Sequence, residues 1–315
     1  MTYKETLFFI AKCLTINHLL NNKIIIEDHL KSGNIDWDAI VKLSTDHLVF
    51  PALYCNLKKA NFLNYLPKDL VEYMKYITNL NRERNEQIIE QAKEINELLL
   101  ANNITPVFLK GTAYLLENLY DDISERMIGD IDMIIDENNI NMADQTLKKN
   151  GYSSSYVLYD DHRHLPRLIK EKKIAAIEIH KNFLEKPFRN NFGYKHIKQN
   201  IKIIDEKISI LGEIDSLTLN ILSQQINDNV QKTGNISLRN YYDYFLKKKK
   251  TDVVQIIDSY KTYEEIINSY DFVYTKIFGV HIDKLKENSK STKKYYQKNL
   301  ENLENLERKK RFKIL

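Results

Sequence analysis

Three acidic residues occupy positions where neighbouring β-strands would bring them together. Asp130 and Asp132 begin the alternating segment 130–135, and residues two apart in a strand point to the same face. Like charges this close raise each other's pKa unless a cation separates them. Glu178 is the single acid in the apolar run 174–179, where burying a lone carboxylate is costly. We therefore expect the three carboxylates to bind a divalent cation, with Mg²⁺ or Mn²⁺ suited to hard oxygen ligands.

A second group of residues offers positive charge and a turn whose backbone an anion can approach closely. Lys110-Gly111-Thr112 follows a short apolar run and precedes a helical pattern, which predicts a strand-to-helix turn. Free N–H groups at a helix start attract anions, and Lys110 and Thr112 add a charge and a hydroxyl. Arg126, just before the aspartate pair, can clamp a phosphate. Paired aspartates with a third acid on a neighbouring strand are typical of two-metal phosphoryl transfer.

Several other polar residues are open to more than one interpretation. His180 would share a strand face with the lone glutamate, where it can orient that carboxylate, contact substrate or serve structure alone. His162 and His164 are spaced for a second metal, but substrate contact or packing is favoured, since no cysteine or further histidine is near. Arg239 and Asp243 lie one helical turn apart, which favours an ion pair or a place in the substrate cleft.

Composition narrows the class of protein. The chain has 315 residues, of which 43% are hydrophobic, as expected of a globular protein with one large domain or a few small ones. Its eight glycines are too dispersed for a Walker loop or a dinucleotide-binding fingerprint. With only two cysteines, no recognisable signal peptide and no long apolar run, we expect a cytoplasmic protein without membrane insertion.

The periodicity predicts an α+β fold in three regions. Residues 1–103 are predicted to be helical and to end in one long helix from about 68 to 102. Residues 104–212 form an α+β unit, and residues 213–315 are helical again and end in a basic tail. Strands are predicted at 105–109, 130–135, 152–158, 174–183 and, as an edge hairpin, 201–210. Further helices are predicted at 111–119, 139–149, 217–230, 237–247, 253–260 and 263–278.

These motifs resemble the DNA polymerase β-like nucleotidyltransferase superfamily, in the branch described as uncharacterised nucleotidyltransferases. The features shared with that branch are Leu109-Lys110-Gly111, Arg126 with Asp130-Ile131-Asp132, Gly151-Tyr152, His164 with Pro166, and Glu178-Ile179-His180. The strong similarity covers residues 105–183, about a quarter of the chain. One departure from the wider superfamily is the phosphate turn, where Lys110-Gly111-Thr112 replaces the usual Gly-Ser.

The resemblance implies a small mixed-sheet palm flanked by helical regions and a metal-dependent nucleotidyltransferase activity. Such an enzyme moves a nucleoside monophosphate from an NTP or dNTP to an acceptor hydroxyl and releases pyrophosphate. By resemblance, Asp130 and Asp132 hold two Mg²⁺ or Mn²⁺ ions, and Glu178 holds the catalytic ion and accepts the proton of the hydroxyl. The residues then expected to bind the nucleotide are Lys110, Gly111, Thr112, Arg126, His180, Arg239 and Asp243.

The acceptor is expected to be nucleic acid because basic residues gather in two segments. These are Lys247–Lys250 and the tail Lys284–Leu315, which holds eleven Lys or Arg against four Glu. Lysines neutralise phosphates, and Tyr295, Tyr296 and Phe312 offer rings that can stack on unpaired bases. The plain alternative is that the lysines form solvated helix faces while the tyrosines pack on the helical region.

Superfamily relatives extend tRNA or DNA ends, block tRNA as toxins or make signals in phage defence. A tRNA or single-stranded acceptor, in a toxin or antiviral-defence setting, is therefore the leading expectation. Two alternatives stay open: nucleotidylation of a protein or small molecule, and a catalytically silent fold that serves as a binding subunit. The intact Asp130, Asp132 and Glu178 argue against the silent subunit.

Overall fold

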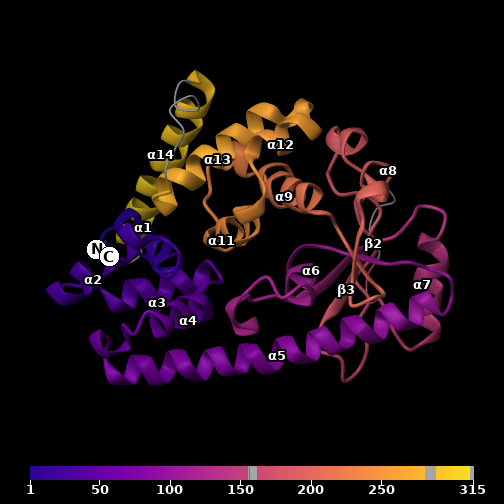
Figure 1. The fold of residues 1–315 in the computed structure, drawn as a ribbon, viewed down its shortest axis with the longest axis horizontal. Coiled ribbons are helices and arrows are strands. Elements are labelled where there is room, and N and C mark those ends of the chain that lie inside the picture. The colour runs from indigo at the N-terminus through magenta and orange to yellow at the C-terminus, as the bar shows by residue number, and fades with distance from the viewer. Residues whose placement is uncertain (155, 157–161, 281–288, 313–315) are drawn as a thin grey trace.

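Helices and one mixed sheet make up the protein in the computed structural model, which describes residues 1–154, 156, 162–280 and 289–312 (Figure 1). This confirms the α+β fold class expected from the sequence. The sheet lies toward one end of the molecule and the N-terminal helices toward the other (Figure 1). Within the described residues, no helix is both long and apolar enough to cross a membrane.

The N-terminal helices form a packed group. They are α1 (Tyr3–Cys13), α2 (Leu20–Ser32), α3 (Trp37–Asp46) and α4 (Phe50–Lys59). The first begins at a capping box in which Thr2 and Glu5 satisfy each other's backbone N–H groups. Asp36 caps α3 by accepting a hydrogen bond from the Ala39 N–H at 2.9 Å.

The long helix α5 (Lys68–Leu100) has 33 residues and closely matches the predicted helix. It runs beneath both the N-terminal helices and the sheet (Figure 1). Its buried face carries amide side chains as well as apolar ones. Gln91 exchanges two hydrogen bonds with the backbone of Ala175, at 2.9 and 3.1 Å, just before a strand of the sheet begins. The helix therefore fixes loops of the sheet by hydrogen bonds as well as by apolar packing.

The sheet has five strands in the order β3-β2-β1-β5-β4. Their bounds are β1 (Val107–Phe108), β2 (Asp130–Ile134), β3 (Ala176–His180), β4 (Lys202–Ile204) and β5 (Ile208–Ile210). Strand β2 is parallel to β3 and antiparallel to β1. Strand β5 is parallel to β1, so of the predicted hairpin only β4 lies at the sheet edge. The strand predicted at 152–158 lies partly outside the described residues, and Ser153 forms an isolated antiparallel bridge with Ile169.

The remaining helices are α6 (Lys110–Leu116), α7 (Ile140–Lys149), α8 (Tyr194–Ile197), α9 (Glu213–Leu222), α10 (Val230–Thr233), α11 (Leu238–Lys247), α12 (Val253–Ser259), α13 (Glu264–Phe278) and α14 (Lys290–Phe312). Of these, α6, α7 and α8 lie near the sheet, whereas α11, α13 and α14 lie away from it (Figure 1). Short 3₁₀ turns occupy 63–65, 123–125, 188–191, 198–200, 248–250 and 261–263.

The single helix predicted at 217–230 is wrong in detail. Helix α9 begins earlier, continues into a π-helical turn (Ser223–Asn227) and stops before Asn229. Asn229 has a left-handed backbone with φ of 60°, which breaks the helix before α10. A π-helical turn inserts an extra residue, and here it forms part of a cavity wall.

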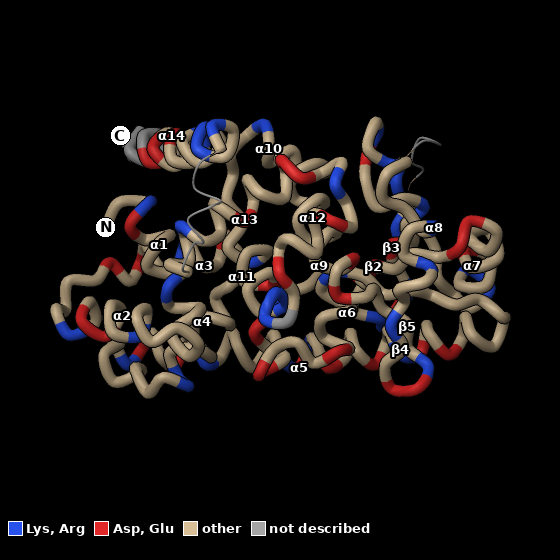
Figure 2. The backbone as a smooth tube through the Cα atoms, turned by 45° about the horizontal axis from the view of Figure 1, so that its top comes forward, with Lys and Arg blue, Asp and Glu red and all other residues tan. Residues whose placement is uncertain are grey.

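Two lysines of the segment 247–250 and one tyrosine of the tail have internal partners. Lys247 is buried and donates to Glu117 at 2.5 Å, and Lys248 pairs with Asp271. Tyr295 is buried, and its hydroxyl donates to Gln225 at 2.9 Å. The described part of the tail is α14, which packs against α1, α10 and α13, whereas residues 281–288 and 313–315 lie outside the described residues. Figure 2 shows basic and acidic residues interspersed along the described backbone.

Candidate active site

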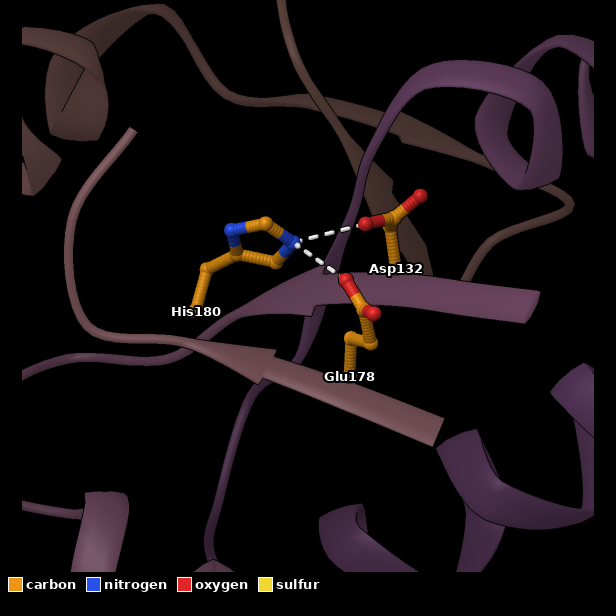
Figure 3. Close-up of side chains that lie close together, drawn as sticks. All are labelled: Asp132, Glu178 and His180. Carbon is orange, nitrogen blue, oxygen red and sulfur yellow. Dashed lines mark hydrogen bonds and ion pairs between the residues drawn. The ribbon is translucent and has the colours of Figure 1, made fainter. Parts of the chain in front are cut away.

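The parallel pairing of β2 and β3 brings the predicted acids together. In this register Asp132 lies directly opposite Glu178, and Asp130 is two residues earlier on the same face. Asp132 and Glu178 are buried, and His180 follows two residues after Glu178 on β3 (Figure 3). One ligand atom from each of Asp132, Glu178 and His180 lies within 4.8 Å of the others, so this group could hold a metal ion.

His180 is placed to orient Asp132. Its Nε2 lies 2.6 Å from Asp132 Oδ1 (Figure 3). Its Nδ1 lies 3.2 Å from Nη1 of Arg163. A guanidinium can only donate, so Nδ1 accepts and Nε2 carries the hydrogen that is donated to Asp132. Burial and the charge of Lys110 lower the pKa of His180 to about 4, which keeps the imidazole neutral near pH 7. In this arrangement the imidazole holds a carboxylate in place, as outer-shell partners of metal ligands do.

The two aspartates have opposite electrostatic environments. Burial alone would raise the pKa of Asp132, but Lys110, whose Nζ donates to Oδ1 at 2.9 Å, and His180 together hold it below its usual range. Burial and the charges of Asp132 and Glu178 raise the pKa of Asp130 to about 6. A carboxylate cluster that resists full ionisation is the donor set that a divalent cation fits.

A segment along the free edge of β3 supplies two further groups. His164 bridges to His180 and Leu168 to Ile177, both antiparallel, so residues 164–168 follow β3 on the side away from β2. His164 Nε2 lies 3.9 Å from Glu178 Oε2, and His162 packs edge-on against the His164 ring at 4.1 Å. The placement fits the predicted substrate contact or packing of these histidines. The same segment carries Arg167, which sequence reasoning missed.

A cavity of about 360 Å³ opens beside the carboxylates. Five basic side chains line it: Lys110, Arg126, Arg163, Arg167 and Arg239. Gly111 and Asp243, also expected to bind nucleotide, are part of its wall, as are residues of α9 and the π-helical turn. Thr112 is buried instead, and its hydroxyl donates to the Asp130 carbonyl at 3.3 Å. The structure thus brings most of the predicted residues to one cavity, with Thr112 and His180 outside its lining.

Two arginines at one end of the cavity carry unused hydrogen-bond donors. Arg126 is buried with Nη2 2.9 Å from Asp243 Oδ2, and Arg239 donates from Nη1 to the Met127 carbonyl at 3.3 Å. The Nε atoms of both arginines are buried without a hydrogen-bond partner. The charge of Arg126, together with burial, lowers the pKa of Arg239 to about 10. Excess positive charge with free donors suits an anion such as a phosphate.

The ion pair predicted between Arg239 and Asp243 does not form. Asp243 pairs with Arg126 through one oxygen and accepts the Tyr120 hydroxyl on the other at 2.5 Å. Oδ2 has the charge of Arg126 beside it but no hydrogen bond, and Arg239 forms no ion pair with either oxygen, although the helical spacing of Arg239 and Asp243 would allow a contact.

Comparison with known proteins identifies the family. The model of the uncharacterised nucleotidyltransferase family matches residues 33–259, well over half of the chain. The chain belongs to this nucleotidyltransferase family. No curated protein and no solved structure matches the chain. The match contains the carboxylates, the basic side chains of the cavity and Asp243, and it ends at the last residue of α12.

The nucleotidyltransferase positions Arg126 through two asparagines that the sequence analysis did not single out. Asn81 and Asn85, one turn apart on α5, are buried and donate to the Arg126 carbonyl at 3.2 and 2.8 Å. Asn81 also donates to the Ser124 carbonyl, and Asn85 to the Ile123 carbonyl. The detectable signal was a pair of asparagines four residues apart, at helical spacing between the apolar positions Met74 and Ile88.

Gly111 is required by packing in this nucleotidyltransferase. A Cβ atom at this position would lie 2.5 Å from Cγ2 of the buried Ile128, closer than real contacts allow. We expect Gly111→Ala to destabilise the fold by about 1–3 kcal/mol, the usual cost of overpacking. Gly129→Ala is the matched control, because its Cβ would meet nothing within 4 Å. Urea unfolding of both variants measures the difference, and equal stability would contradict the packing role.

Proposed function

We propose that this nucleotidyltransferase moves a nucleoside monophosphate from an NTP or dNTP to an acceptor hydroxyl. The observation that carries the proposal is the convergence of Asp130, Asp132 and Glu178 beside a cavity lined by basic side chains. Divalent ions bound there would supply charge neutralisation at the phosphates and would lower the pKa of the attacking hydroxyl. The acceptor oxygen forms a bond to the α-phosphorus. The bond between the α-phosphorus and the oxygen that bridges to the β-phosphorus breaks, and pyrophosphate leaves.

The residues of the chain take distinct roles in this proposal. Asp130 and Asp132 would be shared ligands of two Mg²⁺ or Mn²⁺ ions, and Glu178 would be a ligand of one ion and the acceptor of the hydroxyl proton. Their placement on adjacent strands keeps the three carboxylates in a fixed relation. The oxygen-rich donor set supports these hard cations.

Side chains would bind the β- and γ-phosphates. Helix α6 has only seven residues, so its dipole adds little, and Lys110, Arg126 and Arg239 supply most of the positive charge. Thr112, held on the Asp130 carbonyl, would position that strand end instead of touching phosphate. Asp243 would act through Arg126, which it holds by the buried ion pair.

The acceptor we propose is the hydroxyl end of a nucleic acid. The formal net charge is +4, and Lys290, Lys293 and Lys294 on α14 are exposed. These lysines support binding of a polyanion. Lys247 and Lys248 are not counted among these polyanion-binding lysines, because both are paired with acids.

Label transfer tests the function directly. The protein is incubated with each NTP and dNTP labelled at the α-phosphate, with Mn²⁺ or Mg²⁺, and with total tRNA, single-stranded DNA and lysate protein as acceptors. We expect label in a nucleic-acid fraction, release of pyrophosphate, and loss of both on adding EDTA. Label in the protein fraction would show that the acceptor is a protein and would leave the proposed reaction unchanged. Absence of label and of pyrophosphate under every combination would overturn the proposed activity.

A further inference from the structure

A β-bulge directs Arg167 toward the metal-binding face of the sheet. Between the bridges to β3, four residue steps from His164 to Leu168 match three steps from Ile177 to His180. Residues three apart in a regular strand point to opposite faces. The extra residue lets His164 and Arg167 both face the carboxylates, as bulges near active sites commonly do. Pro166, which lacks a backbone N–H, lies inside the bulge.

Arg167 bridges two of the three carboxylates. Its Nε donates to Glu178 Oε1 at 2.5 Å and its Nη2 to Asp130 Oδ2 at 3.1 Å. Asp132 is bound separately by Lys110 and His180. Each acid therefore has a cationic or hydrogen-bonding partner within the chain. One guanidinium donates to both Asp130 and Glu178, while the second oxygen of Glu178 faces His180 Nε2 at 3.7 Å and His164 Nε2 at 3.9 Å.

The backbone of Arg167 is fixed while its side chain is not enclosed. Its N–H donates to the Tyr156 hydroxyl at 2.9 Å, and the next residue, Leu168, exchanges backbone hydrogen bonds with Ile177 at 3.0 and 2.8 Å. The Arg167 side chain is 50% exposed, against 5% for Glu178. The buried Glu178 needs a positive partner, and a bound cation would supply one as the half-exposed guanidinium moves into solvent.

We propose that Arg167 is a nucleotide-binding residue that leaves Asp130 and Glu178 when a divalent cation binds them. A cation that uses the same oxygens is incompatible with the guanidinium at hydrogen-bond distance, because the two positive charges repel. Arg167 lines the cavity together with Lys110 and Arg239, so its released donors lie beside the expected triphosphate. A guanidinium presents a fork of N–H groups that matches phosphate oxygens. The inference rests on the proposed function.

The proposal predicts that metal and nucleotide binding are coupled through one side chain. Arg167 opposes the cation at the carboxylates and favours the nucleotide once displaced. Its removal should therefore strengthen binding of the metal alone and weaken binding of the nucleotide in the presence of metal. Both changes lower the coupling free energy between metal and nucleotide, which by linkage is the same whichever of the two ligands binds first.

The first measurement is Mn²⁺ binding without nucleotide, followed by the paramagnetic signal of free Mn²⁺. We expect Arg167→Gln to bind Mn²⁺ at least about threefold tighter than wild type, because the cation no longer has to displace the half-exposed guanidinium. Lys173→Gln is the matched control: it removes the same charge from an ion pair with Glu94 that is outside the cavity lining. Its Mn²⁺ affinity should equal that of wild type. Arg167→Lys, which keeps the charge without the fork, should lie between wild type and Arg167→Gln.

The second measurement is binding of a non-hydrolysable NTP analogue at saturating Mn²⁺, by calorimetry. We expect Arg167→Gln to bind it at least about tenfold more weakly, as the loss of a charge-assisted hydrogen bond implies. Unchanged Mn²⁺ affinity in Arg167→Gln, or unchanged analogue affinity, would overturn the role of Arg167. Failure of the wild type to bind Mn²⁺ at all would instead overturn the proposed function itself.

Discussion

Asp132→Ala is expected to abolish nucleotide transfer. Asp132 is the acid at the centre of the site, opposite Glu178 and bonded to both Lys110 and His180. Outer-shell partners of metal ligands typically contribute 10–100-fold, so loss of a direct ligand should lower the transfer rate by at least about 100-fold. Label transfer at saturating Mn²⁺ measures the effect. Asp144→Ala on α7, which removes an acid paired with Lys148 on the surface, is the control and should keep full activity.

Asp132→Ala and a second variant, Asp130→Asn, should differ in stability without metal. The lowered pKa of Asp132 means that its ionised form stabilises the fold at neutral pH, and that this contribution is lost as the pH falls through the folded-state pKa. Asp132→Ala should therefore reduce the melting temperature. Burial and neighbouring acids raise the pKa of Asp130 to about 6, so its ionised form near pH 7 lowers the stability of the fold. Asp130→Asn should therefore keep or raise the melting temperature. An active Asp132→Ala enzyme would contradict the metal-ligand assignment, whatever its stability.

The carboxylate face could be predicted because strand alternation is local. The period-two pattern around Asp130 and Asp132, and the single acid at Glu178, determine which side chains share a face without knowledge of the fold. The long helix α5 was equally predictable, because its apolar spacing extends over many turns. The strands that carry the candidate acids and the long helix α5 therefore follow from short-range pattern, whereas the break of the helix predicted at 217–230 does not.

The partners of those acids could not be predicted because they depend on distant segments. Arg167 reaches the site only through a bulge beside β3, and a bulge has little signature in one sequence. Asn81 and Asn85 bind loop carbonyls more than 35 residues away, although asparagine in a helix is usually solvated. Lys247 was assigned to a basic surface, but burial against Glu117 is decided by how α6 and α11 pack.

Asp243→Ala is expected to cause the largest loss of stability. Asp243 is 1% exposed, and its carboxylate pairs with the buried Arg126 and accepts the Tyr120 hydroxyl. Removing it leaves the Arg126 guanidinium buried beside Arg239 with no carboxylate partner. Breaking one side of a buried pair costs about 3–5 kcal/mol in free energy of unfolding. Urea unfolding without nucleotide measures this loss.

Two comparison variants separate a structural ion pair from a pure nucleotide contact. Asp121→Ala removes the exposed partner of Lys59 from the loop preceding Arg126 and should cost at most about 1 kcal/mol. The double variant Asp243→Ala/Arg126→Met removes both charges, so it should lose less stability than the two single changes added together. If Asp243→Ala unfolds like wild type, Asp243 does not hold Arg126 and must act on the nucleotide itself. If the double variant loses as much free energy of unfolding as the two single changes added together, the two side chains do not stabilise each other. Arg126 would then need another anion, such as a phosphate, to balance its charge.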